Sequence, residues 1–368
     1  MKKVISILMT LAFMFTLITG CTAAESDKQA LDNEFLLTMQ IANPVMTVNG
    51  QEKNIDDDGT AYLLSATNMN RDINIYKLDP SWTKPVLLVN TICKGLHRET
   101  PAIIKKDGEY YFFSSKASGW YPSQTVYTAT TDLGGEWTPM REIGNNSTFD
   151  AQFNRISMVG TSCGVWSYHW GAQREHKTPD GNFPRISIAA FNQGYASMDY
   201  YRYLEFNDKY GIIPVQNGKN LTLNSPATST VSGAKGAKAD CITDGASLES
   251  SAFFQKSSNA ATGTPYILAV DMQKNARISE INLSTRLVNG SEAAYKYTIE
   301  GSTDGKSYKM LVDGRQNWQV GFLILNIEDP ASYRYLRLRV YGVVNVHKGN
   351  SAMWADGIYE FAAFGTPQ

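Results

Sequence analysis

DGEYYFFS, at residues 107–114, decides the fold expected for this chain. An Asp-Gly turn signal is followed at once by aromatic residues of the kind that favour a strand. The stretch DGTAYLLS, at residues 58–65, repeats the pattern, and each copy leads through a second apolar run to a tryptophan, Trp82 or Trp137. A repeat of about 49 residues built from strands predicts the blade of a β-propeller. Two unrelated hairpins of a β-sandwich are the alternative.

The start of the chain has the order of a secretory signal. A short positive head precedes an apolar run of about 15 residues, and Cys21 follows it. This order resembles a bacterial lipoprotein box. The resemblance implies removal of residues 1–20, a lipid on Cys21, a tether over residues 21–34, and a place in the bacterial cell envelope at the outer membrane or cell surface. An ordinary signal with a chance cysteine is the alternative.

Composition excludes several classes of protein. Beyond Cys21 the chain has Cys93, Cys163 and Cys241, which are far apart, odd in number and without a Cys-x-x-Cys pair. A disulfide scaffold and a cysteine metal site are therefore not expected. The net charge is −1 with both signs interspersed, so nucleic acid is not an expected partner. The 20 Tyr, 7 Trp and 15 Phe suit an all-β protein and also the faces of sugars, and composition does not separate the two.

Short apolar runs cut by turn signals continue along the chain, so the expected fold class is all-β. A turn-rich stretch near Gln216 predicts a boundary between two domains, at residues 35–215 and 219–366. In the second domain, Tyr266–Met272 and Ile278–Leu283 are expected as separate strands among about eight. Eight strands in ~150 residues predict a jelly-roll sandwich.

The second domain carries ordered motifs that resemble a known family. They are Thr243-Asp244-Gly245, Val270-Asp271, Ser302–Tyr308, Tyr333–Leu338 and Tyr359-Glu360. Together they resemble a discoidin or coagulation-factor type C domain, the galactose-binding-like fold that includes family 32 carbohydrate-binding modules. The resemblance implies carbohydrate binding.

Two sets of candidate residues follow from this second resemblance. The resemblance implies a structural Ca²⁺ with Asp244 and Glu360 as its acidic ligands, and oxygen ligands suit that ion. Plain turn and surface roles are the alternative for both acids. Trp318, His347 and Trp354 lie in turn-rich segments and could form a sugar platform, with structural packing as the alternative for each.

The first domain resembles family 43 glycoside hydrolases, and specifically the exo-β-1,3-galactanase branch. The motifs that carry the resemblance are Asp56–Tyr62, Arg98–Ala102, Ser118–Pro122 and Phe149–Gln152. The resemblance implies a five-bladed propeller fold. It also implies cleavage of galactan-type polysaccharide.

The resemblance also implies roles for individual residues. Glu99 is the general acid that protonates the departing glycosidic oxygen, and Gln152 takes the water-orienting role. Trp120, Arg98 and Trp170 are expected to contact sugar, with blade packing as the alternative for Trp120. No cofactor is required for this chemistry.

The chain departs from that family in three places. Its blade-forming part, from Leu36 to Phe206, holds about three and a half repeats, so a truncated propeller is expected. The position of the aspartate that tunes the acid is Gly50, and a segment that is usually Gly-Asp-Arg-Trp reads Ser167–Trp170.

Three functions stay open. The first is a surface-anchored hydrolase that acts on galactan by acid-assisted inversion. The second is a catalytically decayed hydrolase that binds carbohydrate as a lipoprotein. The third is one half of a split enzyme, whose propeller a second chain completes.

Overall fold

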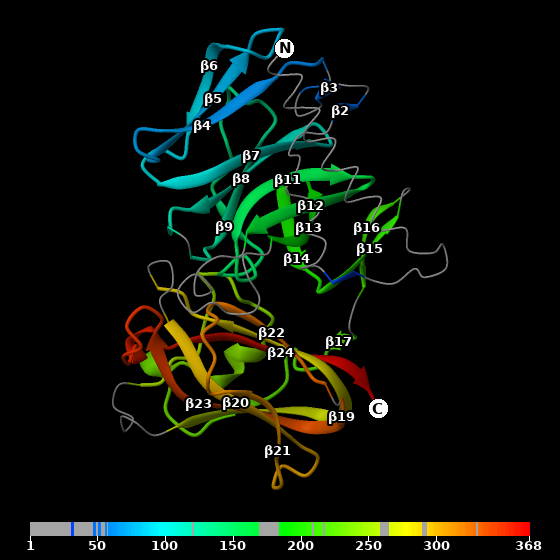
Figure 1. Ribbon diagram of the computed structural model, residues 1–368, viewed down its shortest axis with the longest axis vertical. Coiled ribbons are helices and arrows are strands. Elements are labelled where there is room, and N and C mark those ends of the chain that lie inside the picture. Colours follow the sequence, from blue (N-terminus) through cyan, green and yellow to red (C-terminus); the bar gives the residue numbers. More distant parts are fainter. Residues whose placement is uncertain are drawn as a thin grey trace, which may run out of the picture.

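The computed structural model describes residues 31–32, 47–48, 51–52, 56, 58–119, 121–168, 184–207, 210–215, 218–257, 265–288, 293–328 and 330–368. Every regular element in these ranges is a β-strand or a short 3-10 helix. The strands gather into two parts, one above the other in the view of Figure 1. No helix in the described ranges is long and apolar enough to cross a membrane.

Two four-stranded antiparallel sheets form the centre of the first part, in the orders β10-β9-β8-β7 and β11-β12-β13-β14. Each sheet meanders in chain order, as a propeller blade does. The bounds are β7 Arg98–Lys106, β8 Glu109–Lys116, β9 Thr125–Thr130, β10 Arg141–Ile143, β11 Gln152–Val159, β12 Ser162–Tyr168, β13 Pro184–Asn192 and β14 Tyr195–Tyr200.

The Asp-Gly signal forms the turn that was expected. Asp107 and Gly108 join β7 to β8 with φ of 53° and 85°, so both residues are left-handed, as a two-residue hairpin turn of type I′ requires. Glycine adopts this conformation without steric cost, and aspartate tolerates it better than most residues.

Smaller sheets flank the two blades. One has the order β4-β5-β6 and another β1-β15-β16, while β2 pairs with β3. Among the described residues these sheets do not close into a ring (Figure 1). The expectation of an all-β chain with an incomplete propeller is therefore confirmed. The bounds are β1 Leu31–Asp32, β2 Thr47–Val48, β3 Gln51–Glu52, β4 Tyr62–Thr67, β5 Asp72–Leu78, β6 Pro85–Ile92, β15 Tyr203–Asn207 and β16 Gly211–Val215.

The aromatic strand β8 supplies the core between the blades. Phe113 is fully buried and its ring stacks on Phe153 of β11 at 5.8 Å and on Tyr127 of β9 at 5.9 Å. Phe112 points the other way, because successive strand residues face opposite sides, and its ring meets Trp137 edge-on at 6.2 Å. The repeated aromatic strand therefore holds one blade against the sheets on both sides.

The second part is a sandwich of eight strands along the path β17-β24-β19-β23-β20-β21, with β18 and β22 paired to β19. Its bounds are β17 Lys219–Asn220, β18 Ala227–Ser229, β19 Tyr266–Thr285, β20 Ala293–Ser302, β21 Lys309–Gly314, β22 Phe322–Asn326, β23 Ser332–Asn345 and β24 Ile358–Pro367, with 3-10 helices η1 Ala234–Gly236, η2 Ala239–Thr243 and η3 Met353–Ala355.

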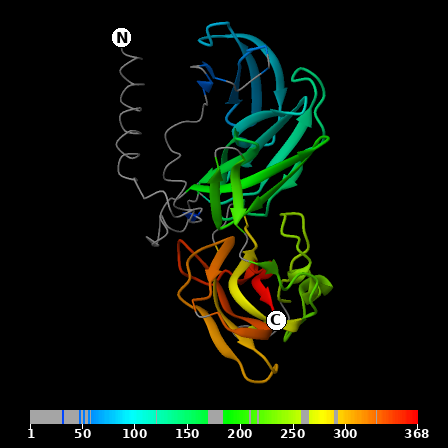
Figure 2. The same cartoon turned by 90° about the vertical axis from the view of Figure 1, so that its right-hand side faces the viewer.

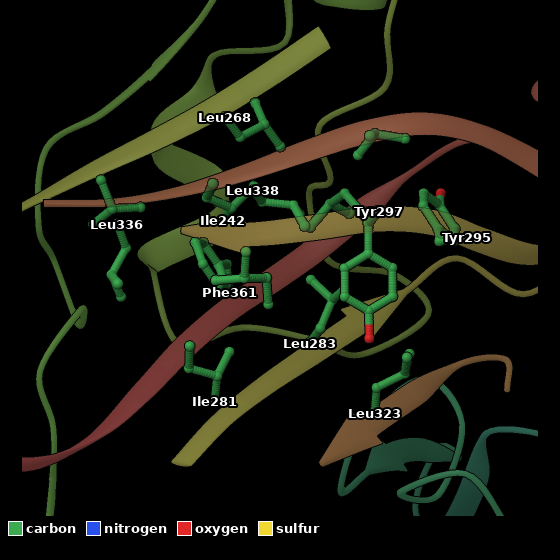
Figure 3. Close-up of a cluster of buried hydrophobic side chains, with 14 of the residues drawn as sticks. Ile242, Leu268, Ile281, Leu283, Tyr295, Tyr297, Leu323, Leu336, Leu338 and Phe361 are labelled. Atoms are coloured by element: carbon green, nitrogen blue, oxygen red, sulfur yellow. The ribbon is translucent and has the colours of Figure 1, made fainter. Parts of the chain in front are cut away.

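Buried and partly exposed residues alternate along β23, as the sequence pattern predicts. Leu336 and Leu338 are fully buried and lie in the cluster drawn in Figure 3, whereas Arg337 between them is half-buried. The expectation of two strands at 266–272 and 278–283 was wrong, because both belong to the single strand β19. Its register shifts between Asp271 and Ala276, and this irregularity lets one strand pair with β23 first and β24 afterwards.

The two parts meet along a contact surface that we call the seam. Its aromatic centre joins Phe149, which precedes β11, to Phe322 of β22 at 5.5 Å, with Tyr200 of β14 6.3 Å from Phe322. Backbone contacts accompany the rings, since the Asn146 N–H donates to the Ser247 carbonyl at 2.6 Å. Figure 2 shows the sandwich below the blade sheets from the side.

Candidate functional site

Glu99 and Gln152 lie at the same end of two neighbouring strands. Glu99 is the second residue of β7, and Gln152 is the first residue of β11. The hydroxyl of Thr100 donates to the backbone carbonyl of Phe153 at 2.7 Å, which ties the residue after Glu99 to the residue after Gln152. The structure therefore brings both sequence-predicted residues to the same end of two neighbouring strands.

The Glu99 carboxylate is partly buried and contacts a neighbouring sheet. Its Oε1 accepts a hydrogen bond from the Asn70 side-chain amide at 3.1 Å. Asn70 lies in the turn between β4 and β5, so a second sheet helps to orient the acid. Sequence reasoning missed Asn70, because it is a turn residue whose only local signal is its preference for loops.

Gln152 is held by the loop that follows β8. Its Nε2 donates to the Ser118 hydroxyl at 2.7 Å and to the Gly119 carbonyl at 3.0 Å. Both donated bonds use the amide nitrogen, so the carbonyl oxygen is the atom that can accept a hydrogen bond from a water or a sugar hydroxyl.

Arg98 lies inside the protein. It is 7% exposed, and its guanidinium donates to the Ser114 hydroxyl at 3.1 Å, to the Ser114 carbonyl at 2.6 Å and to the Gln124 carbonyl at 3.3 Å. Burial lowers the pKa of Arg98 to about 10, and nearby acids, Glu249 of the sandwich and Glu99 among them, act in the opposite direction. These bonds brace the entrance of β7, and sugar contact by Arg98 stays a prediction.

Two of the three predicted platform residues meet the propeller loop at the seam. The His347 ring is hydrogen-bonded to the Tyr121 hydroxyl, and the rings cross edge-on at 5.4 Å. Trp318 packs in the same apolar cluster as Tyr121, with the Lys296 ammonium 3.6 Å from its ring centroid. Trp354 lies in η3 and is 57% exposed.

The predicted Ca²⁺ ligands lie near one another. Glu360 is 7% exposed, its Oε2 accepts from the Gly245 N–H at 3.1 Å, and its Oε1 is buried with no hydrogen-bond partner among the described residues. Burial, together with the nearby Asp244 charge, raises the pKa of Glu360 to about 8. A buried carboxylate oxygen that needs a positive partner fits a Ca²⁺ site, with Asp244 as the second acid. No cluster of three or more potential acidic, histidine or cysteine ligands occurs in the described ranges, so backbone carbonyls would complete such a site.

Several predicted residues lie outside the described part of the chain. These are Cys21, Trp120, Trp170, Gly50 and Gln216 at the domain boundary.

One family model matches the sequence. It is the F5/8 type C domain, and the match covers residues 225–355. No curated protein matches the chain.

Solved structures resemble the chain at low identity. An exo-β-1,3-galactanase from Phanerochaete chrysosporium, solved with β-1,3-galactotriose, is 16% identical with a TM-score of 0.46, over 84% of this chain and 66% of that one. An exo-β-1,3-galactanase from Clostridium thermocellum is 18% identical with a TM-score of 0.42, over 84% and 64%. A putative exo-β-1,3-galactanase from Bifidobacterium bifidum is 25% identical with a TM-score of 0.34, over 39% and 49%.

This chain thus spans 66% and 64% of the length of the first two of these structures. The sequence match to the F5/8 type C domain model lies in the sandwich, at residues 225–355.

Proposed function

We propose that the chain is a glycoside hydrolase that cleaves a galactan- or arabinogalactan-type polysaccharide. The observation that supports the proposal is the Thr100 to Phe153 hydrogen bond, because it joins the residue after Glu99 to the residue after Gln152. The family 43 motifs around both residues support the choice of reaction and of sugar.

In the proposed reaction, Glu99 gives its proton to the glycosidic oxygen as the bond from that oxygen to the anomeric carbon breaks. A water attacks the anomeric carbon from the opposite face, forms the new C–O bond and releases a proton to solvent, so the configuration inverts. An amide is a poor base, so Gln152 orients this water rather than deprotonating it. Its nitrogen is bound to Ser118 and Gly119, which fixes the direction of its carbonyl oxygen.

The test compares Glu99→Gln with the unchanged protein on β-1,3-galactan. The amide keeps the shape of the acid and its contact with Asn70, but it cannot donate the proton. We expect hydrolysis to fall by about 10²–10⁴-fold. Glu136→Gln is the matched control, since Glu136 is exposed in the turn between β9 and β10. Equal rates for Glu99→Gln and the unchanged protein would remove Glu99 from the reaction.

A decayed hydrolase that binds carbohydrate is the second candidate. The observation that favours it is the amide of Gln152 at the position where the family 43 resemblance puts the water-orienting residue, because inversion normally uses a second carboxylate. Binding of β-1,3-galactan by calorimetry, without release of galactose, would establish this candidate in place of the first.

The cell-envelope location is a further part of the proposal. It rests on the lipoprotein-like order of the first residues, with Cys21 as the lipidated residue. Fractionation of cells should find the chain with membranes, and Cys21→Ser should release it. A second chain that completes the propeller belongs to the same set of proposals, and co-purification of a partner from native cells tests it.

A further inference from the structure

We propose that the sandwich positions Gln152, because its contacts hold the turn that leads into β11. This turn, residues 145–151, lies on the blade side of the seam and ends directly before Gln152. The role of Gln152 as the residue that orients the attacking water rests on the proposed function. The contacts of the turn do not depend on that role, so the two can be tested separately.

Three successive residues of the turn have a left-handed backbone. Thr148, Phe149 and Asp150 have φ of 50°, 56° and 64°, and none of them is a glycine. A side chain disfavours this conformation, because its Cβ comes too close to the following carbonyl oxygen. A run of three such residues therefore persists only where the surrounding structure holds it.

The blades hold the turn on one side. The Thr148 hydroxyl donates to the Ser123 carbonyl at 2.6 Å, and the Ser123 N–H donates to the Ala151 carbonyl at 3.2 Å. Ser123 belongs to the loop between β8 and β9, and the start of the same loop binds the amide nitrogen of Gln152. A shift of the turn would therefore reach Gln152 both along the chain and through this loop.

The sandwich holds the turn on the other side. Asn146 is 3% exposed, its backbone N–H donates to the Ser247 carbonyl at 2.6 Å, and its Nδ2 donates to the Thr285 carbonyl at 2.8 Å. The Phe149 ring packs on the Phe322 ring at 5.5 Å. The three sandwich residues are far apart in the sequence, so these contacts form together only when the sandwich is folded and docked.

Gly321 brings the sandwich backbone directly against the turn. It has φ of 76°, and a Cβ added there would lie 2.9 Å from the Cβ of Ser147, closer than Cβ atoms in proteins normally come. Ser147 is fully buried. Gly321 is itself held, since its N–H donates to the Thr285 hydroxyl at 3.1 Å and its carbonyl accepts from the Thr285 N–H at 2.6 Å. An alanine at this position would therefore displace the turn.

The first experiment measures hydrogen exchange by mass spectrometry over residues 145–152 of the full chain. We expect Gly321→Ala to accelerate exchange in this segment by about tenfold or more, because its hydrogen bonds open locally. The matched control is Gly305→Ala. Gly305 also has a left-handed φ, of 72°, but a Cβ there would meet only Tyr335, at an ordinary 3.4 Å. It lies between β20 and β21, and Figure 1 places β21 at the end of the sandwich away from the blades.

Asn146→Ala is the second variant, and it decides the question if Gly321→Ala does not fold. It removes the bond to the Thr285 carbonyl without adding atoms to the seam. Exchange over residues 145–152 should again be faster than in the unchanged protein. Unaltered exchange in the variants that fold, or equal acceleration in Gly305→Ala, would overturn the proposal.

The second experiment measures kcat and KM on β-1,3-galactan. We expect Gly321→Ala to lower kcat by about 10–10²-fold with little change in KM, because a displaced Gln152 orients the water poorly but does not bind the polymer. In a Gln152→Ala background, Gly321→Ala should have no further effect, since the residue through which it acts is gone. A merely structural role of the seam would give neither result. Unchanged kcat in Gly321→Ala, or a further loss in the Gln152→Ala background, would overturn the positioning role.

The two experiments separate this inference from the proposed function. If the unchanged protein does not hydrolyse β-1,3-galactan, the proposed function fails. Faster exchange in Gly321→Ala and Asn146→Ala, but not in Gly305→Ala, would still sustain the positioning of the segment that ends at Gln152. If the unchanged protein is active and Gly321→Ala alters neither exchange nor kcat, the positioning role is rejected and the hydrolase remains.

Discussion

Replacing Phe322 by alanine should uncouple the two parts of the protein. Phe322 is 7% exposed, and its ring meets Phe149 at 5.5 Å and Tyr200 at 6.3 Å across the seam. Truncating a buried phenylalanine costs about 3–5 kcal/mol, of which aromatic pairs account for about 0.5–1.5 kcal/mol each. For a domain of the sandwich's size, 1 kcal/mol corresponds to about 2–4 °C in Tm. We therefore expect a fall of about 10 °C.

Differential scanning calorimetry of the full chain measures this effect. We also expect the unfolding transition to broaden or divide, because the sandwich and the blades lose the contact that makes them unfold together. Tyr341→Ala is the control, since Tyr341 is an aromatic residue of the sandwich that is 42% exposed. Its Tm should change by no more than ~2 °C. If Phe322→Ala shifted Tm no further than Tyr341→Ala, the aromatic centre of the seam would not couple the two parts.

Three further predictions concern buried groups. Phe113→Ala should lower the free energy of unfolding in urea by about 3–5 kcal/mol, because it empties the stack between blades, and a loss below 1 kcal/mol would contradict that packing. Arg98→Met should lower the free energy of unfolding by about 1–3 kcal/mol, because it removes the donor to Ser114 and Gln124. A higher free energy of unfolding in this variant would show that burying the charge costs more than its hydrogen bonds contribute. With a chelator present, Glu360 keeps its proton up to about pH 8 in the folded protein but only up to about pH 4.5 in the unfolded chain. The free energy of unfolding should therefore fall as the pH rises from about 4.5 to 8, by at most ~5 kcal/mol. Glu360→Gln should flatten the slope and Ca²⁺ should reduce it for the unchanged protein; parallel pH curves for the two proteins would refute the buried acid.

The local sequence pattern was enough to predict the blade strands and many strands of the sandwich. The Asp107–Gly108 turn, the aromatic strand after it and the alternation along Tyr335–Val340 each follow from neighbouring residues, whose side chains must face one side or the other. The same logic failed at β19, because an irregularity inside one long strand has the same sequence appearance as a loop between two strands.

The seam could not be predicted, because its partners are far apart in the chain. Phe149 and Phe322 are ordinary aromatic residues in their local context, and only docking of the two parts makes them neighbours. The backbone hydrogen bond from Glu249 to Gln124 across the seam gave no sequence signal either, since an acid in a turn is usually solvated. Glu99 and Gln152 were predicted through family motifs, and the closeness of their two strand ends depends on a hydrogen bond that no spacing rule indicates.

The aromatic contacts across the seam limit how this protein could be rebuilt from parts. Domains that follow one another in a chain are commonly regarded as interchangeable attachments. Here a foreign domain grafted after residue 218 would lack Phe322 and would leave Phe149 without its partner ring across the seam. Recombination between such genes would therefore have to transfer both halves together, and the pair should be inherited as one unit.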